Sequence, residues 1–300
     1  MRALDISGVP ADVRHKMGLA KLPLDQALTR TTALTELSGR CALVTGAGGS
    51  GLGNAIAHRM ADAGAVVAVL DIDQGRAQQT VVEIQERFGA DRAFAVVADS
   101  TDWNALDEAL SVVAERTGGI DILVANVGGS GAQAGSGQRA PIAISFAGAD
   151  QASIDRVVRT NLLGSLYVAT LASRRMVARG QGRIILISSQ NANAAVPGVA
   201  VYSSCEAALH TLAKCMASEL GPLGVSTVCV APGLMIGQEQ LDVLSTPSPL
   251  AEVLAGGADL NSLGRPGTFD DVASVVTFLA TDAASYIHGT TITVAGGIGG

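Results

Sequence analysis

The chain has 300 residues and a mass of 30.2 kDa, a length at which one large α/β domain can bury a single continuous core. Hydrophobic residues make up 48% and charged residues 16%, a composition that excludes an intrinsically disordered protein. The formal net charge of −7 argues against nucleic acid and membrane surfaces as partners, because both repel an acidic protein.

Residues 1–36 precede the first predicted strand and carry Pro10 and Pro23 among short amphipathic pieces. We interpret this segment as an N-terminal extension that packs on the domain or on a neighbouring subunit, with a disordered tail as the alternative. Charged residues interrupt it, so it does not have the apolar centre of a signal peptide. No apolar run in the sequence reaches the roughly 20 residues that span a bilayer. We therefore expect a cytoplasmic protein.

From residue 37 onward, short and almost wholly apolar runs alternate with segments of helical length. This pattern is typical of strands buried on both faces of a parallel sheet. The predicted strands are Cys41–Thr45, Ala65–Asp71, Ala93–Ala98, Ile120–Ala125, Arg183–Ser188, Ser226–Ala231 and Thr290–Val294. The predicted helices are one that begins near Leu52, followed by Gln74–Phe88, Asp102–Thr117, Asp150–Arg179, Tyr202–Leu220 and Asp270–Ala280. With right-handed crossovers, this order predicts a single α/β domain over residues 37–300, a doubly wound parallel sheet of about seven strands with helices on both faces.

A glycine-rich turn, TGAGGSGLG from Thr45 to Gly53, joins the first predicted strand to the first helix. Free backbone amides and the positive end of the helix dipole make such a turn a candidate pyrophosphate site. The second strand ends in Asp71, where a carboxylate accepts hydrogen bonds from ribose hydroxyls and repels a 2′-phosphate. These features predict NAD rather than NADP. The alternative is a tight turn and a capping aspartate with no nucleotide.

Further motifs make the sequence similar to the short-chain dehydrogenase/reductase family over residues 37–300. They follow the glycine turn in order: Asp71, Asp99, the VANVGG run with Asn126 and Gly128, Asn161 in RTNLLG, Ser188-Ser189, Tyr202 in VYSSCEAAL, Pro232-Gly233 in VAPG, and the C-terminal run that begins SLGRPG. The resemblance implies a Rossmann fold, a nicotinamide cofactor and hydride transfer to or from a secondary alcohol or ketone.

The resemblance also implies roles for individual residues. Tyr202 exchanges a proton with the substrate, Ser189 hydrogen-bonds the substrate oxygen, and Asn161 holds a water of the proton relay. The cofactor then lies against Gly46, Gly51, Leu52, Gly53, Asp71, Asp99, Asn126, Gly128, Pro232 and Gly233. The structural alternatives for the three catalytic positions are a polar strand end, an interface tyrosine and a helix-interior asparagine.

One departure bears on the mechanism. The family places a lysine four residues after the tyrosine, and this chain has Glu206 there. Lys214, the next lysine, lies roughly 18 Å along the same predicted helix and cannot replace it. We expect Glu206 to keep the ribose-binding part of the lysine's task and to give up the electrostatic part. A redox-inactive scaffold and a non-redox dehydratase or isomerase are the alternative functions.

Other sequence features predict less. Cysteines and histidines show no ligand spacing, so we expect no metal site, and the four cysteines read as small buried thiols. The Gly/Ser-rich run at 128–137 either overhangs the ligand crevice or is a passive insertion. A small apolar or cyclic substrate fits the apolar residues Val196, Pro197, Val199, Leu234, Met235 and Ile236. The resemblance implies a homo-oligomer, most simply a tetramer, built on the two long helices at Asp150–Arg179 and Tyr202–Leu220.

Overall fold

The computed structural model describes residues 36–128, 145–194, 196–237 and 262–297. They form an α/β domain around a seven-stranded sheet in the order β3-β2-β1-β4-β5-β6-β9, with every neighbouring pair parallel. Because the chain moves outward in one direction up to β3 and then in the other from β4, the sheet is doubly wound, as predicted. The strands are β1 Cys41–Thr45, β2 Val66–Asp71, β3 Ala93–Val97, β4 Ile122–Ala125, β5 Gly182–Ile187, β6 Val225–Pro232 and β9 Thr291–Val294.

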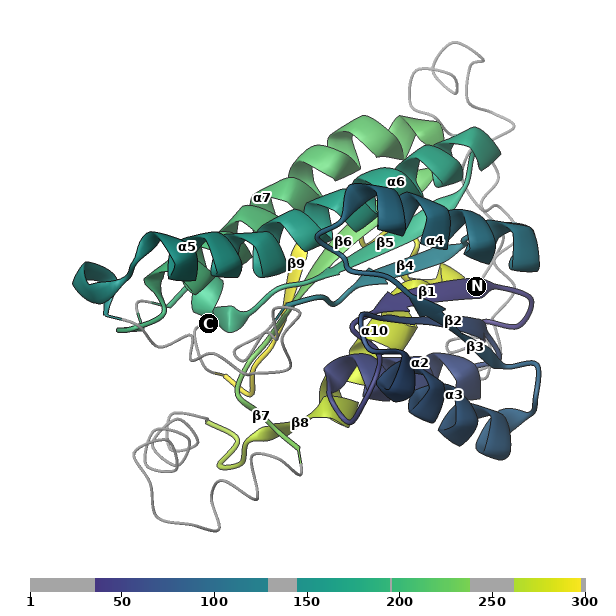
Figure 1. Ribbon diagram of the computed structural model, residues 1–300, viewed down its shortest axis with the longest axis horizontal. Helices are drawn as coiled ribbons and strands as arrows, with labels where there is room; N and C mark the ends of the chain where they lie inside the picture. Colours follow the sequence, from purple (N-terminus) through teal and green to yellow (C-terminus); the bar gives the residue numbers. More distant parts are fainter. Residues whose placement is uncertain (1–35, 129–144, 195, 238–261, 298–300) are drawn as a thin grey trace, which may run out of the picture.

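Helices cover both faces of this sheet (Figure 1). One face carries α2 (Leu52–Asp62), α3 (Gln74–Phe88) and α10 (Phe269–Ala280), and the other carries α4 (Trp103–Thr117), α6 (Gly164–Arg179) and α7 (Ala200–Leu220). Successive strand residues point to opposite faces. In β1, Val44 therefore joins the core beneath α2 while Leu43 joins the core beneath α4. Double-sided burial explains why these strands are apolar throughout.

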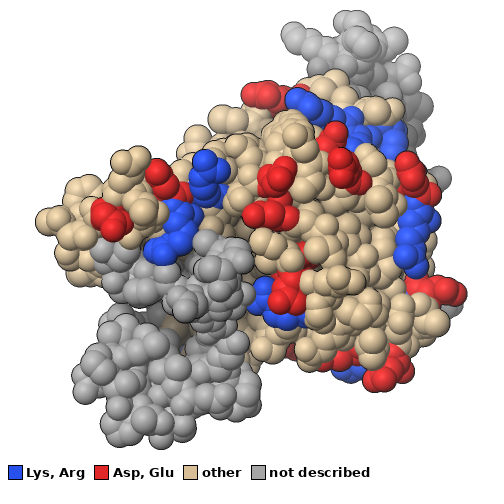
Figure 2. Space-filling model, in the orientation of Figure 1, with Lys and Arg blue, Asp and Glu red and all other residues tan. Residues whose placement is uncertain are grey.

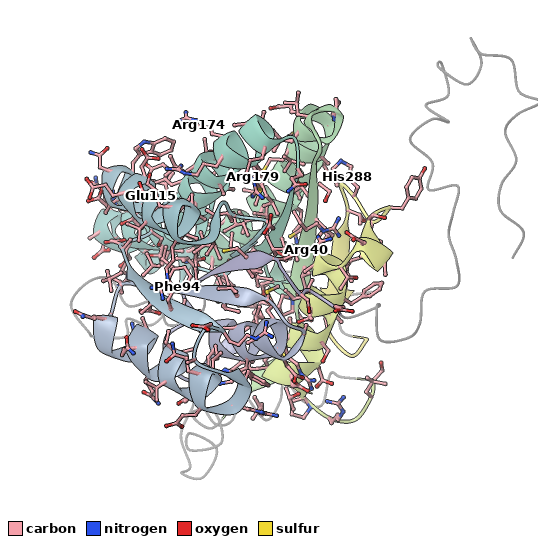
Figure 3. The ribbon with its side chains drawn as sticks, turned by 90° about the vertical axis from the view of Figure 1, so that its right-hand side faces the viewer. Arg40, Phe94, Glu115, Arg174, Arg179 and His288 are labelled. Carbon is pink, nitrogen blue, oxygen red and sulfur yellow. The ribbon has the colours of Figure 1, made fainter. Side chains whose placement is uncertain are left out.

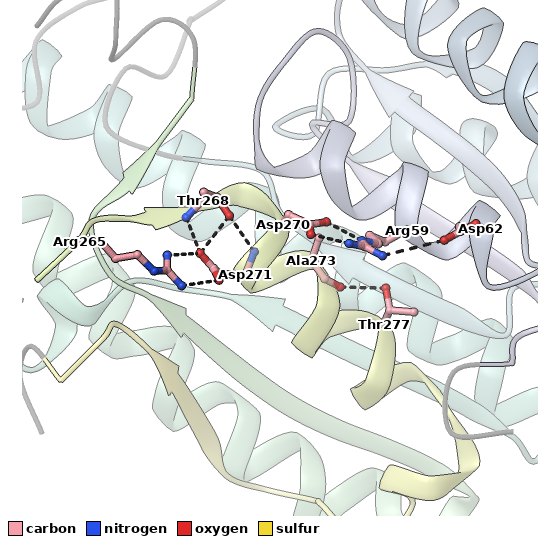
Figure 4. Close-up of polar contacts among 8 residues, drawn as sticks. All are labelled: Arg59, Asp62, Arg265, Thr268, Asp270, Asp271, Ala273 and Thr277. Carbon is pink, nitrogen blue, oxygen red and sulfur yellow. Dashed lines mark hydrogen bonds and ion pairs between the residues drawn. The ribbon is translucent and has the colours of Figure 1, made fainter. Parts of the chain in front are cut away.

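A set of polar contacts fixes the start of α10 (Figure 4). Two-residue strands β7 (Met235–Ile236) and β8 (Gly267–Thr268) pair just before it. Thr268 and Asp271 then form a capping box, in which each side chain accepts a hydrogen bond from the other residue's backbone amide. Arg265 pairs with Asp271, and Arg59 of α2 forks onto Asp270. The Arg59–Asp270 pair joins α2 to α10, the first and last helices of at least eight residues in the described part of the chain.

The predicted helix Asp150–Arg179 is interrupted. The structure has α5 at Gln151–Val158, a π-helical turn at Arg159–Leu163 and then α6. In a π turn the amides bond five residues back, which leaves a carbonyl of the preceding turn free. Here Asn161 fills that place, since its Nδ2 donates to Val157 O at 3.0 Å. Hydrophobic periodicity did not predict the widened turn.

The extension at 1–36 falls outside the described residues except for Glu36, as does the glycine/serine run except for Gly128. Within the described ranges, no helix is long and apolar enough to cross a membrane and no cluster of His, Cys, Asp or Glu could hold a metal. Acidic and basic side chains are interspersed over the face shown in Figure 2. Cys41, Cys205 and Cys229 are buried, but the prediction was wrong for Cys215. That residue is exposed because it lies opposite the buried stripe of α7 that contains Ala213.

Candidate active site

The predicted site residues meet at one edge of the sheet, where the parallel strands end. Gly46 follows β1, Asp71 ends β2, Asn126 follows β4, Ser189 follows β5 and Pro232 ends β6. In an open parallel sheet this edge forms the ligand crevice at the point where the strand order reverses. Here the reversal falls between β1 and β4, so the glycine turn and Asn126 lie at its centre.

The turn between β1 and α2 requires glycine for two physical reasons. Gly46 and Gly49 have φ values of +62° and +88°, a region that side chains disfavour. A Cβ on Gly53 would lie 2.3 Å from Gly46 O, so the backbone itself occupies that space. The N-cap residue Gly51 makes no side-chain cap, and the first turn of α2 contains no acidic residue. The amides after Gly51, including that of Leu52, therefore form an uncapped helix N-terminus suited to an anion.

Asp71 lies beside this turn and is 6% exposed. Its carboxylate accepts hydrogen bonds from Gly48 N and Asp73 N, both at 3.0 Å, and from Arg76 Nη2 at 3.1 Å. The ion pair with Arg76 was not foreseen, because the preference for NAD was argued from the negative charge of Asp71 alone. Arg76 lies in the first turn of α3, where it also approaches Gly48 and Gly49. The negative charge of Asp71 is therefore partly compensated.

Three other predicted cofactor residues have defined partners. Asp99 Oδ1 accepts from both the amide and the hydroxyl of Thr101, which holds the loop after β3. Asn126 Nδ2 donates to Thr45 O at 3.2 Å, and Asn126 N donates to Thr45 Oγ1 at 3.0 Å. Gly128 has φ +131°, and a Cβ there would lie 2.7 Å from Asn161 Oδ1. The ends of β1 and β4 and the π turn are thus packed against one another.

Tyr202 and Ser189 lie near each other at the carboxyl edge of the sheet. Tyr202 lies in the first turn of α7 and is 9% exposed, while Ser189 caps the short turn after β5 and accepts from Asn191 N. Burial raises the pKa of Tyr202 strongly, and the charge of Glu206 raises it further. The nearby Ser189 hydroxyl lowers it but does not offset these causes. The phenol is consequently protonated across the physiological range.

Glu206 lies one helical turn beyond Tyr202 and is 4% exposed. Neither a hydrogen bond nor an ion pair reaches its carboxyl group from the described residues. Burial therefore raises its pKa to about 8. At neutral pH the side chain is mostly the uncharged acid, which donates one hydrogen bond and carries no charge. Its repulsion of a Tyr202 phenolate acts only at alkaline pH.

The last strand pair completes the crevice. Gly233 N donates to Val294 O at 2.9 Å, and a Cβ on Gly233 would lie 2.7 Å from Ala295 Cα. Close packing of β6 on β9 therefore requires glycine at position 233, directly after Pro232. On its other side, Tyr202 borders a cavity of only about 10 Å³ near Phe146 and Ile154, too small for a substrate.

Two residues of this region were missed by sequence reasoning. Arg76 is one, and its place in the first helical turn after Asp71 was the available indication. His210 is the other, since its Nε2 lies 2.8 Å from Ser188 Oγ beside the catalytic-position serine. His210 follows Glu206 by one helical turn, so the spacing from Tyr202 through Glu206 to His210 placed all three on one face of α7.

Comparison with known proteins identifies the class. A family model described as "Enoyl-(Acyl carrier protein) reductase" matches residues 46–299, which is most of the chain. The protein belongs to the short-chain dehydrogenase/reductase family. Members of this family that resemble it are named dehydrogenases and reductases, so the chain is an oxidoreductase acting on alcohol or carbonyl groups with a nicotinamide cofactor.

Individual relatives cover almost the whole chain. A cyclohexanol dehydrogenase of a Rhodococcus species is 34% identical over 276 residues, which span 87% of this chain and 97% of the relative. A 7alpha-hydroxysteroid dehydrogenase of Escherichia coli is 32% identical over 262 residues, covering 87% of this chain and 95% of the relative. A solved 7 alpha-hydroxysteroid dehydrogenase complexed with NADH and 7-oxo glycochenodeoxycholic acid has a TM-score of 0.78 at 30% identity, covering 90% of this chain and 97% of that one.

Proposed function

We propose that this protein is an NAD-dependent oxidoreductase of secondary alcohols and ketones in which Tyr202 is the acid/base, assisted by Ser189 and Asn161. The observation that carries the proposal is that Tyr202 and Ser189 lie near each other at the carboxyl edge of the sheet, at the same edge as the glycine turn. A small apolar or cyclic substrate is the class we favour, in line with the names of the cyclohexanol and hydroxysteroid relatives.

The residues present fit a dinucleotide. The uncapped start of α2 and the glycine turn suit a pyrophosphate, and the backbone comes so close at Gly53 that no side chain could stand there. Asp71 suits ribose hydroxyls and favours NAD, although Arg76 offsets part of its charge. We assign Asp99 to the adenine end, Asn126 and Gly128 to the ribose region, and Pro232-Gly233 to the nicotinamide. When bound, the cofactor supplies or accepts the hydride.

The protonated state of Tyr202 favours ketone reduction over alcohol oxidation at neutral pH. A buried, protonated Tyr202 is ready to donate its proton to a carbonyl oxygen that Ser189 also hydrogen-bonds. The same phenol is a poor base for an alcohol until the pH rises. Glu206, protonated at neutral pH, is suited to donate a hydrogen bond to a ribose hydroxyl. We therefore expect ketone reduction at neutral pH to be faster than alcohol oxidation.

The deciding experiment is a substrate panel. Secondary alcohols with NAD⁺ and the matching ketones with NADH are followed by the absorbance of NADH, with NADP(H) in parallel. Turnover of at least one pair, faster in reduction at pH 7, supports the proposal. Tight NADH binding with no turnover of any pair would contradict the enzymatic part and leave the cofactor site intact.

One observation favours the alternative of a redox-inactive or non-redox member. Among the described residues that influence the pKa of Tyr202, none is a cation. A scaffold, however, has no need for the Tyr202–Ser189 pair, or for the π turn that aims Asn161. For assembly we propose a homotetramer through the helical run from α5 to α6 and through α7, tested by light scattering; a mass near that of a monomer would refute it.

A further inference from the structure

A second cavity lies at the opposite edge of the sheet, where the parallel strands begin. Its volume is about 560 Å³. Residues just before β1 and β4 line it, together with the starts of β5 and β6, the carboxyl ends of α4 and α6, and the segment after α10. Figure 3 looks onto this edge and labels Arg40 and Arg179, which lie near the centre of the view. None of the predicted site residues takes part in it.

The charged residues of the cavity wall are three arginines and two aspartates. Arg40 pairs with Asp282 at 2.6 Å, and Arg179 pairs with Asp121 at 2.8 Å. These two ion pairs are half-exposed at the rim. The third arginine, Arg183, is left without a carboxylate, so the wall carries excess positive charge in a protein whose net charge is −7.

Arg183 is the unusual residue. It is 5% exposed at the start of β5, where its Nη1 donates to Ser226 Oγ at 3.0 Å. Its Nε and Nη2 are shut off from solvent and have no hydrogen-bond partner in the structure. Burial lowers its pKa to about 10, so the guanidinium is still charged at neutral pH. Buried cations in folded proteins are normally paired, because an unpaired one is costly to desolvate.

Binding to the carbonyl groups at the helix ends does not explain the position of Arg183. The carboxyl ends of α4, α6 and α10 bring partial negative charge to this edge, which favours cations there. Arg179 meets that need directly, since its Nη1 donates to Ile120 O and its Nη2 to Asp121. Arg183 makes only the bond to Ser226 and reaches no helix-end carbonyl.

We propose that this cavity binds the phosphate group of a small molecule, with Arg183 and Ser226 on its inner wall and Arg40 and Arg179 at its rim. The guanidinium groups of Arg40 and Arg179 match the geometry and charge of phosphate, and the hydroxyl of Ser226 adds a further donor. Arg183 lies directly beneath this surface, so its charge attracts the anion. The anion neutralises the buried cation, which a neutral ligand cannot do. The volume admits a phosphate monoester as well as inorganic phosphate.

The test measures phosphate binding without the nicotinamide cofactor. Inorganic phosphate is titrated against the full chain and followed by ³¹P NMR at constant ionic strength, with glycerol 3-phosphate and acetate as separate arms. We expect Arg183→Met to weaken phosphate binding by about tenfold or more, and Arg59→Met, at a surface arginine of α2 that does not line the cavity, to leave it unchanged. Tighter binding of glycerol 3-phosphate than of inorganic phosphate would identify a phosphorylated metabolite as the ligand class.

Two outcomes would overturn the proposal. Undiminished phosphate binding by Arg183→Met would place the anion at the glycine turn instead, and acetate binding as tight as phosphate would indicate a carboxylate site. Replacement of an unpaired buried cation by an apolar side chain is usually tolerated, so we expect this variant to fold. Should it not fold, Ser226→Ala gives the answer, because loss of the hydroxyl is expected to weaken phosphate binding about threefold or more, and unchanged binding would refute the site. NADH binding by the same variants tests the proposed function separately.

Discussion

Asp71 and Glu206 are two buried carboxyl groups at the same edge of the sheet, and they are exposed to nearly the same extent, 6% and 4%. Asp71 accepts two backbone amide bonds and pairs with Arg76, whereas Glu206 receives no donor from the described residues. Donors stabilise a carboxylate, while burial without donors favours the neutral acid. Hydrogen-bond donors, more than burial, therefore distinguish the surroundings of Asp71 from those of Glu206.

The largest effect is expected from Tyr202→Phe, which removes the phenol that we propose as the general acid. No positive charge at position 206 lowers the pKa of this phenol. Turnover falls by about 1,000-fold or more, the size typical of a lost general acid. NADH affinity stays within about threefold, because the phenol lies outside the region assigned to adenosine and pyrophosphate. Steady-state kinetics and calorimetric NADH titration measure the two quantities. Substantial residual turnover would mean that another group carries the proton.

The second effect concerns stability and pH. The pKa of Glu206 is raised in the folded protein from its ordinary 4.5 to about 8, so the native state binds this proton more tightly than the unfolded chain. The resulting stabilisation is complete below about pH 4.5 and is lost as the pH rises to about 8. It amounts to at most about 5 kcal/mol.

Glu206→Gln supplies the matched control, because the amide has the shape of the protonated acid and cannot ionise. Urea unfolding at pH 5 and at pH 8.5 is expected to show a larger loss of stability for the wild type than for the variant. All other titrating groups are common to both proteins and cancel in the difference. Equal losses would show that Glu206 is solvated or paired in solution.

The third prediction concerns Glu206→Lys, which replaces a carboxyl group that is mostly neutral at pH 7 with a positively charged side chain. At about 6 Å and an effective dielectric constant near 20, one positive charge stabilises a phenolate by roughly 2.8 kcal/mol, or about two pKa units. Glu206→Lys is therefore expected to move the pH profile of alcohol oxidation down by about one unit or more and to raise turnover at pH 7 about tenfold. Loss of a robust wild-type activity in this variant would make the glutamate a dedicated catalytic or substrate-binding group.

The smallest effects are expected from substitutions at Asp71 and at its partner Arg76. We expect wild-type protein to bind NADPH about tenfold more weakly than NADH, or about 1.4 kcal/mol. Asp71→Asn removes most of this preference, and Arg76→Ala increases it a few-fold because the carboxylate loses its compensating charge. Calorimetry with both cofactors measures the ratio. A preference that does not respond to either substitution would assign discrimination to other residues.

The sequence predicted the structure correctly where a residue pattern is compatible with only one local structure. Double-sided burial made the strands apolar throughout, and the turn at Gly46 to Gly53 needs glycine, so fold and crevice were both predictable. The Arg76–Asp71 pair depends on the rotamer of a long side chain, which spacing does not encode. The π turn around Asn161 and the bond from Ser188 to His210 were missed for a related reason, since both are set by tertiary packing.

The π turn also sets how α6 is rotated about its axis relative to α5. An α-helix advances about 100° per residue, so if Arg159–Leu163 wound as regular α-helix with all its residues kept, everything downstream would rotate by about that angle. The apolar stripe of α6, with Val168, Leu171 and Ala172 against the sheet, would then turn away from its core. The extra residue in the π turn thus lets one run of helix make two sets of contacts. Asn161 faces Gly128, and the apolar side of α6 still packs on the sheet.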